Sequence, residues 1–326
     1  MNISEVARIA GVSPATVSRA LNHPEIVKPA TLQKIRRVIQ ELDYTPNPAA
    51  QALMTGKFHL VGLLVPNLQN AFIAQLALGV EEYLLEHGYT ALICNSHEKL
   101  EREKYIVRSF LQRRVDGIIW AYPHDTSIKD LKLPAVLVGP QKMYPKGNYD
   151  CAEIDEERII QLSVARLYSR GHRKIAAIAG DENFAVSTVR LQYLKGELTK
   201  LGLELPPEYV VYGSYGSIES GAQAMEKLLT LRDRPTAVIA FNDMIALGAL
   251  KALIVHKIRV PEEMAVIGAD DIPFAKHFSP GLTTIRAPGF DLGREAARLL
   301  VSRLNYPNKP RQNVVIPVSL VARNTD

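Results

Sequence analysis

The sequence has few cysteines and no long apolar stretches. Only two cysteines, Cys94 and Cys151, occur among 326 residues, far apart and in apolar segments. We therefore expect neither a disulfide framework nor a metal cluster, and buried free thiols in a reducing cytoplasm fit better. No apolar run approaches the roughly 20 residues that a membrane-spanning helix needs. The first eleven residues include Ser4, Glu5 and Arg8, so we do not expect a secretory signal.

The motifs of several enzyme classes are also absent. No GxGxxG follows the first expected strand, and the chain has neither a GxxxxGK[ST] loop nor a Gly-x-Ser-x-Gly elbow. Such loops cradle phosphates or expose a nucleophile, so their absence argues against the chemistry that depends on them. Asp270 and Asp271 are carboxylates, but neighbours in sequence rarely converge on one reacting atom. We predict a protein that is not an enzyme and that uses neither a cofactor nor a metal.

Basic charge is concentrated in the first 57 residues. This segment holds seven Lys and Arg against four Asp and Glu, and so carries +3 of the net charge of +5. A small basic segment on a nearly neutral remainder predicts a polyanionic partner for that segment alone.

The length of the chain exceeds that of one ordinary hydrophobic core, which favours two or three domains.

The first 42 residues predict three short helices. Asn2 and Glu5 form a capping box before the first helix, and Gly11 ends it. Ser13 caps the second helix, with Pro14 at its first position. A third helix with one apolar face follows. Two helices joined by a three-residue turn, with a third that closes the core, are typical of a helix-turn-helix.

After residue 57, short apolar runs alternate with amphipathic helices. We expect strands at 60–65, 90–94, 117–121, 135–138, 174–179, 209–212, 237–241 and 264–267. We expect helices at 72–87, 102–113, 158–170, 186–201, 218–231, 244–256 and 291–304. Apolar strands that are each followed by a helix indicate parallel sheets. Two doubly wound lobes fit this length better than one large sheet or a closed barrel, although alternation alone does not separate them.

A set of short motifs is spread in order along almost the whole chain. They are Glu5-Val6-Ala7, Ala10-Gly11-Val12-Ser13, Thr16-Val17-Ser18-Arg19, Leu21-Asn22, Tyr44-Thr45-Pro46-Asn47, Val61-Gly62, Asp116-Gly117-Ile118-Ile119, Gly171-His172, Pro235-Thr236-Ala237, Asn242-Asp243, Ala246-Leu247-Gly248, Arg259-Val260-Pro261, Asp270-Asp271 and Leu282-Thr283-Thr284-Ile285. This ordered set resembles the LacI/GalR repressors. The resemblance implies an all-α helix-turn-helix domain over 1–46 and a hinge helix over 47–57. It implies a two-lobed α/β domain over 58–326, with doubly wound parallel sheets like those of periplasmic binding proteins, which binds an effector and dimerises.

The second helix carries side chains suited to DNA. Small residues near its start let the backbone approach base edges, and Arg19, one turn after Ala15, can pair bidentately with guanine. Hydroxyls at the helix start suit phosphate oxygens. The predicted contacts are Ser13, Pro14, Ala15, Thr16, Ser18, Arg19 and Asn22. The alternative is that Ser13 only caps the helix and Arg19 is only solvated.

The resemblance implies a second DNA contact in the hinge, through Asn47, Ala50 and Leu53. Leu53 falls where a side chain wedges into a central base step from the minor groove, which kinks the duplex. Ala50 lies one turn earlier and is small enough to let a paired helix approach. An isolated helix of this length is unstable in water, so it can act as a switch. Alternatively, Leu53 packs on the sensor domain.

Polar and aromatic side chains follow several expected strands, where two lobes leave a crevice. The candidates are Asn70, Phe72, Trp120, Tyr122, Asp155, Arg190, Asn242 and Asp270. Such groups around aromatic faces suit a sugar or sugar derivative. The resemblance places Asp155, Arg190, Asn242 and Asp270 at effector-binding positions. Three bland alternatives stay open: Trp120 fills a core, Asp270 pairs with Arg190, and Asp271 braces a turn.

The expected partners are a pseudo-palindromic double-stranded operator, a small polar effector and a second copy of the chain. The chain ends at Asp326, which leaves no room for a tetramerising helix, so we expect a homodimer. We expect a cytoplasmic, nucleoid-associated repressor. A transporter's solute-binding protein would explain the body but not the basic head. An activator, or a repressor that needs a protein corepressor, stays open.

Overall fold

The computed structural model describes residues 2–22, 24–44, 56–124, 131, 133–144, 149–182, 184–214 and 217–326. The chain divides into two compact units, Met1–His59 (unit 1) and Leu60–Asp326 (unit 2). Among the described residues, no helix combines the length and the apolar character that crossing a membrane requires.

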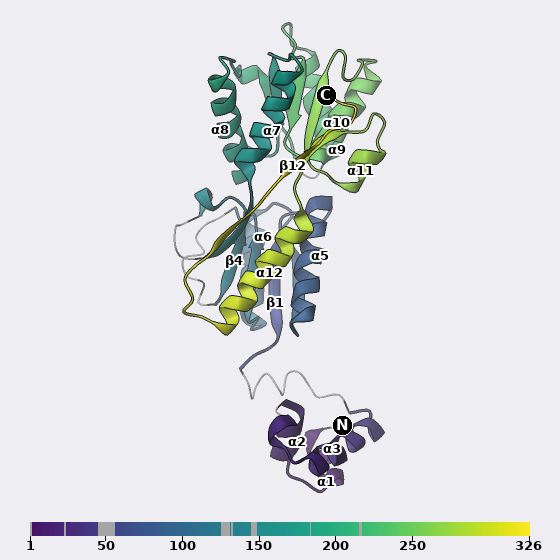
Figure 1. The fold of residues 1–326 in the computed structure, drawn as a ribbon, viewed down its shortest axis with the longest axis vertical. Coiled ribbons are helices and arrows are strands. Elements are labelled where there is room, and N and C mark those ends of the chain that lie inside the picture. Colours follow the sequence, from purple (N-terminus) through teal and green to yellow (C-terminus); the bar gives the residue numbers. More distant parts are fainter. Residues whose placement is uncertain are drawn as a thin grey trace. The chain divides into compact units, whose positions relative to one another are not determined.

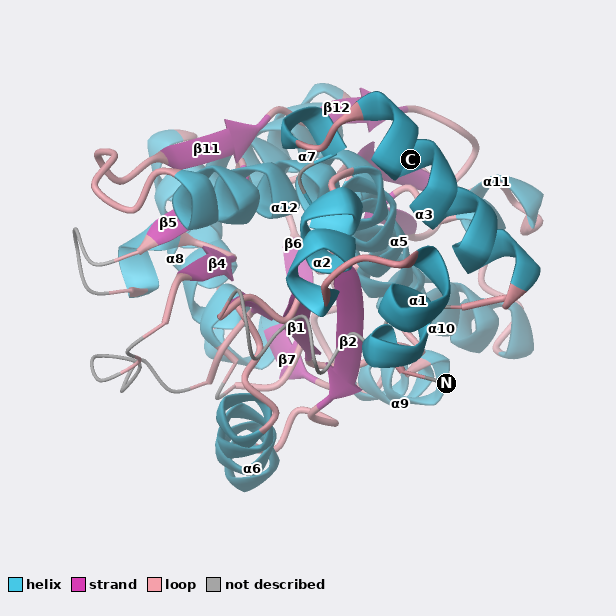
Figure 2. Cartoon of the chain, turned by 90° about the horizontal axis from the view of Figure 1, so that it is seen from below, coloured by secondary structure: helices cyan, strands magenta, loops and turns pink. Residues whose placement is uncertain are grey.

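Unit 1 is helical, as predicted. Its elements are α1 (Ile3–Ala10), α2 (Pro14–Asn22), a 3-10 turn (Pro24–Ile26) and α3 (Pro29–Glu41), drawn in Figure 2. The predicted caps are confirmed. Asn2 Oδ1 accepts from the amide of Glu5 at 3.1 Å, and Ser13 Oγ accepts from the amide of Thr16 at 3.2 Å. Gly11 ends α1 with φ of 60°, a left-handed conformation that glycine adopts without steric cost.

The three helices of unit 1 enclose a small apolar core. Its buried members come from all three helices and the residue that closes them: Val6, Ala7, Ala10, Val17, Ala20, Ile35, Val38 and Tyr44. Val17 and Ala20 turn inward from α2, three residues apart on one face. The opposite face of α2 is therefore left at the surface.

Unit 2 contains two parallel sheets, each with helices on both faces. Lobe 1 contains β1 (Leu60–Val65), α5 (Ala71–Glu86), β2 (Thr90–Asn95), α6 (Leu100–Gln112), β3 (Gly117–Ala121), β4 (Ala135–Val138), a 3-10 turn (Gln141–Met143), β5 (Asp150–Ile154), α12 (Gly289–Asn305) and β11 (Asn313–Ile316). Lobe 2 contains α7 (Glu156–Ser169), β6 (Ile175–Ala179), α8 (Ala185–Lys200), a 3-10 turn (Pro207–Tyr209), β7 (Val210–Tyr212), α9 (Ile218–Leu229), β8 (Ala237–Ala240), α10 (Asp243–Val255), β9 (Ala265–Asp270), α11 (Pro273–His277), β10 (Thr283–Arg286) and β12 (Ser319–Val321). Figure 1 shows both lobes.

The strand orders confirm two doubly wound lobes. Lobe 1 has the order β11-β5-β4-β3-β1-β2, and lobe 2 has β12-β10-β9-β8-β6-β7. All neighbours are parallel except β10 and β12. The chain passes between the lobes after β5, after β10 and after β11. Three connections at one side leave the carboxyl ends of the two sheets facing a common crevice.

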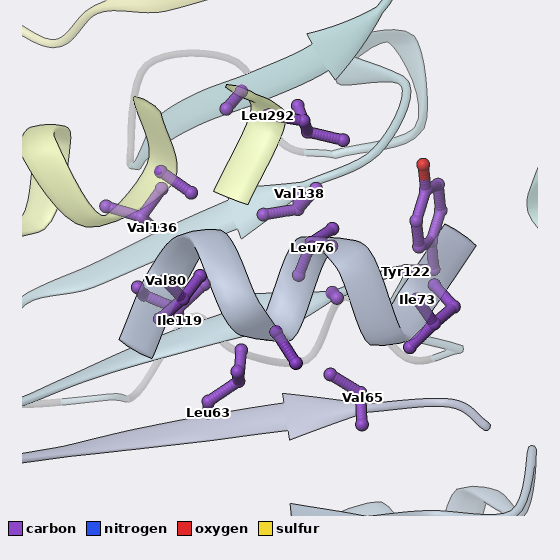
Figure 3. Close-up of a cluster of buried hydrophobic side chains, with 14 of the residues drawn as sticks. Leu63, Val65, Ile73, Leu76, Val80, Ile119, Tyr122, Val136, Val138 and Leu292 are labelled. Carbon is purple, nitrogen blue, oxygen red and sulfur yellow. The ribbon is translucent and has the colours of Figure 1, made fainter. Parts of the chain in front are cut away.

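The core of lobe 1 lies between its sheet and two helices from distant parts of the sequence. Leu76 and Val80 of α5 and Leu292 of α12 pack on Leu63 and Ile119 from the sheet (Figure 3). On the other face of the sheet, α6 covers a second cluster that includes Phe110. The β-branched and leucine-rich strands are thus buried on both faces, as their composition predicts.

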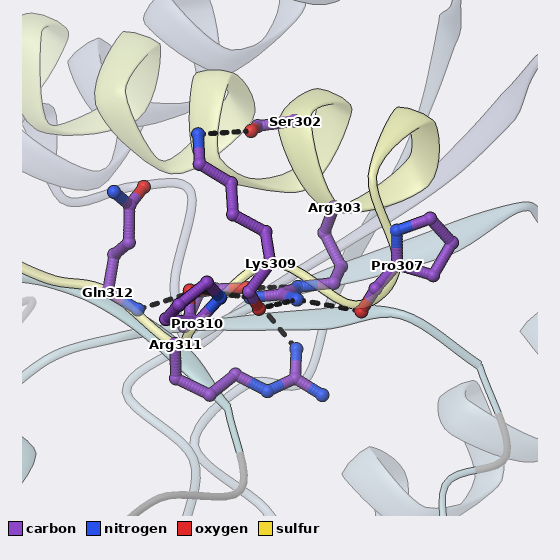
Figure 4. A network of polar contacts seen from close by, with 8 residues as sticks. Ser302, Arg303, Pro307, Lys309, Pro310, Arg311 and Gln312 are labelled. Atoms are coloured by element: carbon purple, nitrogen blue, oxygen red, sulfur yellow. Dashed lines mark hydrogen bonds and ion pairs between the residues drawn. The ribbon is translucent and has the colours of Figure 1, made fainter.

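A polar network joins α12 to the sheet edge of lobe 1. Arg303 donates from Nε and Nη2 to Asp150 at 2.8 and 2.9 Å, and both side chains are buried. Arg303 also donates to backbone carbonyls of the segment after α12, and Gln312 donates its amide to Asp150 at 2.9 Å (Figure 4). Burial raises the pKa of Asp150, but the bonds from Arg303 and Gln312 outweigh it and leave the pKa lowered. This network positions β11 beside β5.

The eight expected strands and seven expected helices of unit 2 are all present, with ends that shift by at most a few residues. Four strands, β5, β10, β11 and β12, and helix α11 were not among the expected elements. Two of these strands, β11 and β12, lie at sheet edges and are partly exposed, so they lack the continuous apolar run of a central strand. Helix α11 has only five residues.

Candidate functional site

A cavity lies between the two lobes of unit 2, at the carboxyl ends of their strands. The space between its walls is about 460 Å³, including the opening to solvent. Its lining comes from both lobes: Pro66, Asn67, Asn70, Phe72, Ile73, Glu98 and Tyr122 from lobe 1, and Phe184, Val186, Arg190, Phe241, Asn242 and Asp270 from lobe 2. Six of the eight predicted effector residues are therefore brought together.

Two asparagines occupy matching places in the two lobes. Asn70 begins α5 after β1, and its Oδ1 accepts from the amide of Phe72 at 2.9 Å. Asn242 begins α10 after β8, and its Oδ1 accepts from the amide of Ile245 at 2.8 Å. Capping thus fixes both side chains at the strand ends. The Nδ2 of Asn70 has no partner among the described residues, so it is available as a donor to a ligand.

Arg190 lies on α8 with its guanidinium held from behind. Its Nε donates to Oε2 of Glu156 at 2.6 Å, and its Nη1 donates to the carbonyl of Phe241. Burial raises the pKa of Glu156, and the neighbouring Arg190 charge opposes this effect. The alternative pairing of Arg190 with Asp270 is not found, because Glu156 takes that role. Glu156 is a partner that sequence reasoning missed.

Asp270 ends β9 and is 9% exposed. Its φ of 117° is in the left-handed region that a non-glycine residue rarely adopts. Its carboxylate accepts no hydrogen bond from any described residue, although it lines the cavity. Burial raises its pKa well above the usual range, and the nearby carboxylate of Asp243 adds to this effect. An unpaired buried carboxylate that faces a cavity is suited to ligand donors.

Asp243 holds the loop behind Asp270. Its Oδ1 accepts from the hydroxyl of Thr284 at 2.5 Å, and its Oδ2 accepts from the amide of Ile272 at 2.9 Å. Burial raises its pKa to about 7 against the opposing effect of these two bonds. Asp271, by contrast, pairs with Arg286 and Arg323 outside the cavity, which agrees with a bracing role.

Aromatic rings form the apolar walls of the cavity. The ring of Tyr122 on lobe 1 lies 6.3 Å from that of Phe184 on lobe 2, so the two lobes meet through aromatic side chains. Tyr122 has φ of 50°, which turns its side chain out of the alternation of β3. Sequence reasoning predicted Phe72 and Tyr122 but missed Phe184 and Phe241, which belong to otherwise apolar segments.

Two predicted residues lie away from the cavity. Trp120 is 5% exposed and packs in the cluster under α6, with its indole Nε1 unpartnered among the described residues. Alternation along β3 places it on the face opposite Ile119, so it fills a core. Asp155 caps α7, accepting from the amide of Arg158 at 2.9 Å, and does not line the cavity. Its neighbour Glu156 reaches inward instead.

Unit 1 presents the predicted DNA-reading residues on one helix. Pro14, Ala15 and Arg19 are exposed on α2, and Thr16 and Ser18 are partly exposed. Ser13 also approaches the hydroxyl of Thr16 at 2.9 Å, so capping occupies it at least in part. Asn22 is the last residue of α2, and its side chain lies outside the described structure.

The predicted hinge contacts, Asn47, Ala50 and Leu53, lie outside the described residues. The same holds for most of the expected hinge segment over 47–57. The boundary between the two units falls after His59.

Family models match both units. Residues 2–47 match a model described as bacterial regulatory proteins, lacI family, and residues 164–325 match a periplasmic binding protein-like domain.

Curated relatives match over nearly full length. The HTH-type transcriptional repressor PurR of Vibrio vulnificus (strain CMCP6) is 32% identical, over 99% of this chain and 98% of the relative. The HTH-type transcriptional repressor CytR of Escherichia coli (strain K12) is also 32% identical, over 99% of this chain and 95% of the relative.

Solved structures share the fold. A lac repressor dimer bound to operator and the anti-inducer ONPF matches with a TM-score of 0.90 and 28% identity, over 100% of this chain and 98% of the other. A complex of the transcriptional regulator CelR with cellobiose matches with a TM-score of 0.77 and 30% identity, over 100% of both chains.

Proposed function

The chain belongs to the lacI family of bacterial regulatory proteins. We propose that it is a transcriptional repressor whose affinity for operator DNA is controlled by a ligand that binds in the cavity of unit 2. The observation that carries this proposal is the lining of that cavity. It combines a buried carboxyl group that has no hydrogen-bond partner among the described residues, an arginine, two asparagines that cap helices, and aromatic walls. No enzymatic step is part of the proposal.

The effector is a small polar molecule, a sugar or sugar derivative. Asn70, Arg190, Asn242 and Asp270 supply donors and acceptors for hydroxyl groups, while aromatic rings such as Tyr122 supply stacking faces. The complex of CelR with cellobiose supports a sugar, since that relative has the same fold and 30% identity. Binding on both lobes favours one arrangement of the lobes over others, which is how a ligand shifts such an equilibrium.

DNA is read by α2 of unit 1. Arg19 is exposed and is the long donor that reaches guanine in the major groove, and Ala15 is small enough to let the helix approach. Ser13, Thr16 and Ser18 contact phosphates, and these contacts set the position of the helix without reading sequence. Pro14 and Asn22 complete the set of contacts from this helix.

A hinge over residues 47–57 couples the two activities. Asn47, Ala50 and Leu53 contact the minor groove, with Leu53 as the apolar wedge. A Leu53→Ala variant should bind operator more weakly, because the wedge supports the bend that brings further contacts. Unchanged operator affinity of this variant would refute the wedge.

The repressor acts as a homodimer on a pseudo-palindromic operator. Unit 2 leaves large apolar side chains exposed on its helices, among them Leu85 of α5 and Val255 of α10. These are candidates for the contact between copies. The cytoplasm, at the nucleoid, is the place where such a dimer meets its DNA.

One experiment tests the function as a whole. Purified protein is used to select palindromic duplexes from a random pool at physiological salt, and binding of the selected duplex is compared with that of random duplex. We expect preference for the selected duplex and a change in its affinity when a stabilising sugar is added. The absence of any preference, with or without sugars, would overturn the proposal.

A further inference from the structure

The cavity is lined by carboxyl groups that pair with no cationic side chain in the part of the chain that the structure describes. Arg190, Glu98 and Asp270 are the charged residues of the lining. The Arg190 charge is already compensated by Glu156 at 2.6 Å, and this partner is itself buried. Neither Glu98 nor Asp270 is in an ion pair within the described part of the chain. The cavity therefore holds two carboxyl groups that no described cation pairs with, one from each lobe.

Asp270 provides the unpaired carboxyl group on lobe 2. It is 9% exposed, and no described residue donates a hydrogen bond to it. Asp243 lies behind it and adds a second source of negative potential. A ligand that donates a hydrogen bond to Asp270 would supply the partner that the described residues do not. An anionic ligand would instead meet like charge in a region of low dielectric.

Glu98 provides the unpaired carboxyl group on lobe 1. It and His97 have consecutive left-handed conformations, with φ of 58° and 54°. The amide of His97 donates to Oδ1 of Asn95 at 3.1 Å, and the amide of Glu98 donates to the carbonyl of Pro66 at 3.1 Å. Non-glycine residues persist in this region only when their surroundings hold them there. The loop thus holds Glu98 at the cavity.

The environment of Glu98 suits an ionised carboxylate more than that of Asp270 does. Its side chain is only partly buried, and Nδ2 of Asn67 donates to its Oε1 at 3.5 Å. Asn67 is oriented by the amide of Gln69, which donates to its Oδ1 at 3.0 Å. The second oxygen of Glu98 has no partner among the described residues. Burial raises the pKa of Glu98, while the bond from Asn67 and the neighbouring His124 oppose this effect. An ammonium group placed beside the second oxygen would favour the charged form further.

We propose that the effector carries an amino group as an ammonium ion, which pairs with Glu98 on lobe 1 while its hydroxyl groups donate to Asp270 on lobe 2. This inference rests on the proposed function and narrows its ligand to amino-bearing sugars. The aromatic walls suit both parts of such a molecule, because rings attract cations as well as the C–H faces of sugars. Sugar phosphates and sugar acids are disfavoured by the same charges.

The test compares matched sugars on the full-length protein. Glucose, galactose and mannose are each measured beside their 2-amino-2-deoxy and 6-phosphate forms, by thermal shift and then by calorimetry. We expect at least one amino sugar to bind ten times or more tightly than its parent sugar, and the phosphates to bind less tightly than the parents. A parent or phosphate that binds as tightly as its amino form, or a panel in which no amino sugar binds, would overturn the inference.

Two variants assign the preference to Glu98. Glu98→Gln keeps the size of the side chain but removes its charge, and should reduce the advantage of the amino sugar to twofold or less. The matched control is Glu101→Gln on α6, whose side chain is 84% exposed and pairs with Lys104. The control should keep the full preference. An equal preference in wild type and Glu98→Gln would contradict the assignment, and melting without ligand checks that both variants fold.

Operator binding separates this inference from the function on which it rests. If a neutral sugar binds best and alters the affinity for the selected duplex, the proposed repressor function stands and the proposal of an amino-bearing effector is contradicted. If the protein prefers no duplex under any condition, the function fails, whatever the sugar panel shows.

Discussion

Arg190 and Glu156 form a buried ion pair beside the cavity, with Nε of the arginine 2.6 Å from Oε2 of the glutamate. Each residue is 5% exposed. The second oxygen of Glu156 is buried and has no partner among the described residues. Both charged groups are therefore removed from water, and one charged hydrogen bond between them compensates for the loss of hydration. Its function is to hold the guanidinium at the cavity while leaving no net charge behind it.

Removal of one partner should destabilise unit 2. A Glu156→Ala variant leaves the Arg190 charge buried without compensation, which typically lowers the free energy of unfolding by about 3–5 kcal/mol. Urea unfolding monitored by circular dichroism measures this loss. The matched control is Glu263→Ala, which breaks the exposed pair with Arg259 and should change stability far less. Equal losses in the two variants would contradict a special cost of burial.

Two glycines on helices of lobe 2 predict opposite effects of the same substitution. A Cβ on Gly248 of α10 would lie 2.0 Å from the carbonyl oxygen of Ile218 at the start of α9. Since backbone must move to admit it, Gly248→Ala should lower the free energy of unfolding by about 1–3 kcal/mol. A Cβ on Gly196 of α8 meets nothing within 4 Å. Gly196→Ala should raise stability by about 0.5–1 kcal/mol, because alanine favours the helix.

The midpoints of thermal unfolding of the two alanine variants test this contrast. Each serves as the control of the other, because both replace a helical glycine in the same lobe. A stabilised Gly248→Ala variant would show that α9 and α10 are packed less closely than the structure places them.

Local chemistry predicted much of the site. Asn70 and Asn242 were recognised because each follows an expected apolar strand, and the resemblance to the family also pointed to Asn242. The structure adds that both cap helices, which keeps their side chains near the strand ends. Asp270 was recognised by the same reasoning at the end of its strand. These residues depend on short-range rules, which one sequence is enough to apply.

Other residues depend on backbone conformation that the sequence does not display. Trp120 and Tyr122 looked equivalent at the end of one strand, but only Tyr122 has the positive φ that turns it to the cavity. Glu98 was missed for the same reason, since it owes its position to two consecutive left-handed residues. Glu156 was missed because its partner, Arg190, lies 34 positions away. Long-range pairing of this kind requires the assembled fold.

The buried carboxyl of Asp243 makes stability depend on pH. Its pKa is about 7 in the folded protein, against about 3.9 for an unfolded aspartate. Between these values the folded state binds more protons than the unfolded state. The free energy of unfolding should therefore fall as pH rises through this window, by up to about 1.4 kcal/mol per pH unit from this group.

An Asp243→Asn variant should flatten this dependence. The side-chain oxygen of the new asparagine can still accept from the backbone amide of Ile272, and its side-chain nitrogen can donate to the hydroxyl of Thr284. The local contacts therefore survive the substitution. Urea midpoints of wild type and variant are compared at pH 4.5, 6 and 8, with the exposed Asp291→Asn as control. The variant should gain on wild type as pH rises, and the control should not. A constant difference at all three pH values would contradict the assignment to Asp243.

Arg19 is expected to read sequence, whereas the general positive charge of unit 1 only attracts DNA. An Arg19→Lys variant keeps the charge but loses the planar fork that pairs with guanine O6 and N7. The ratio of affinities for the selected operator and for random duplex should fall tenfold or more, since a bidentate contact discriminates by about 1–3 kcal/mol. Affinity for random duplex should stay nearly constant, because phosphate attraction depends on charge.

The matched control is Arg36→Lys on α3, which is also exposed and should leave the ratio of affinities unchanged. If Arg19→Lys keeps the wild-type ratio at the same salt concentration, Arg19 is a phosphate contact or a solvated side chain, and base reading must come from other residues of α2.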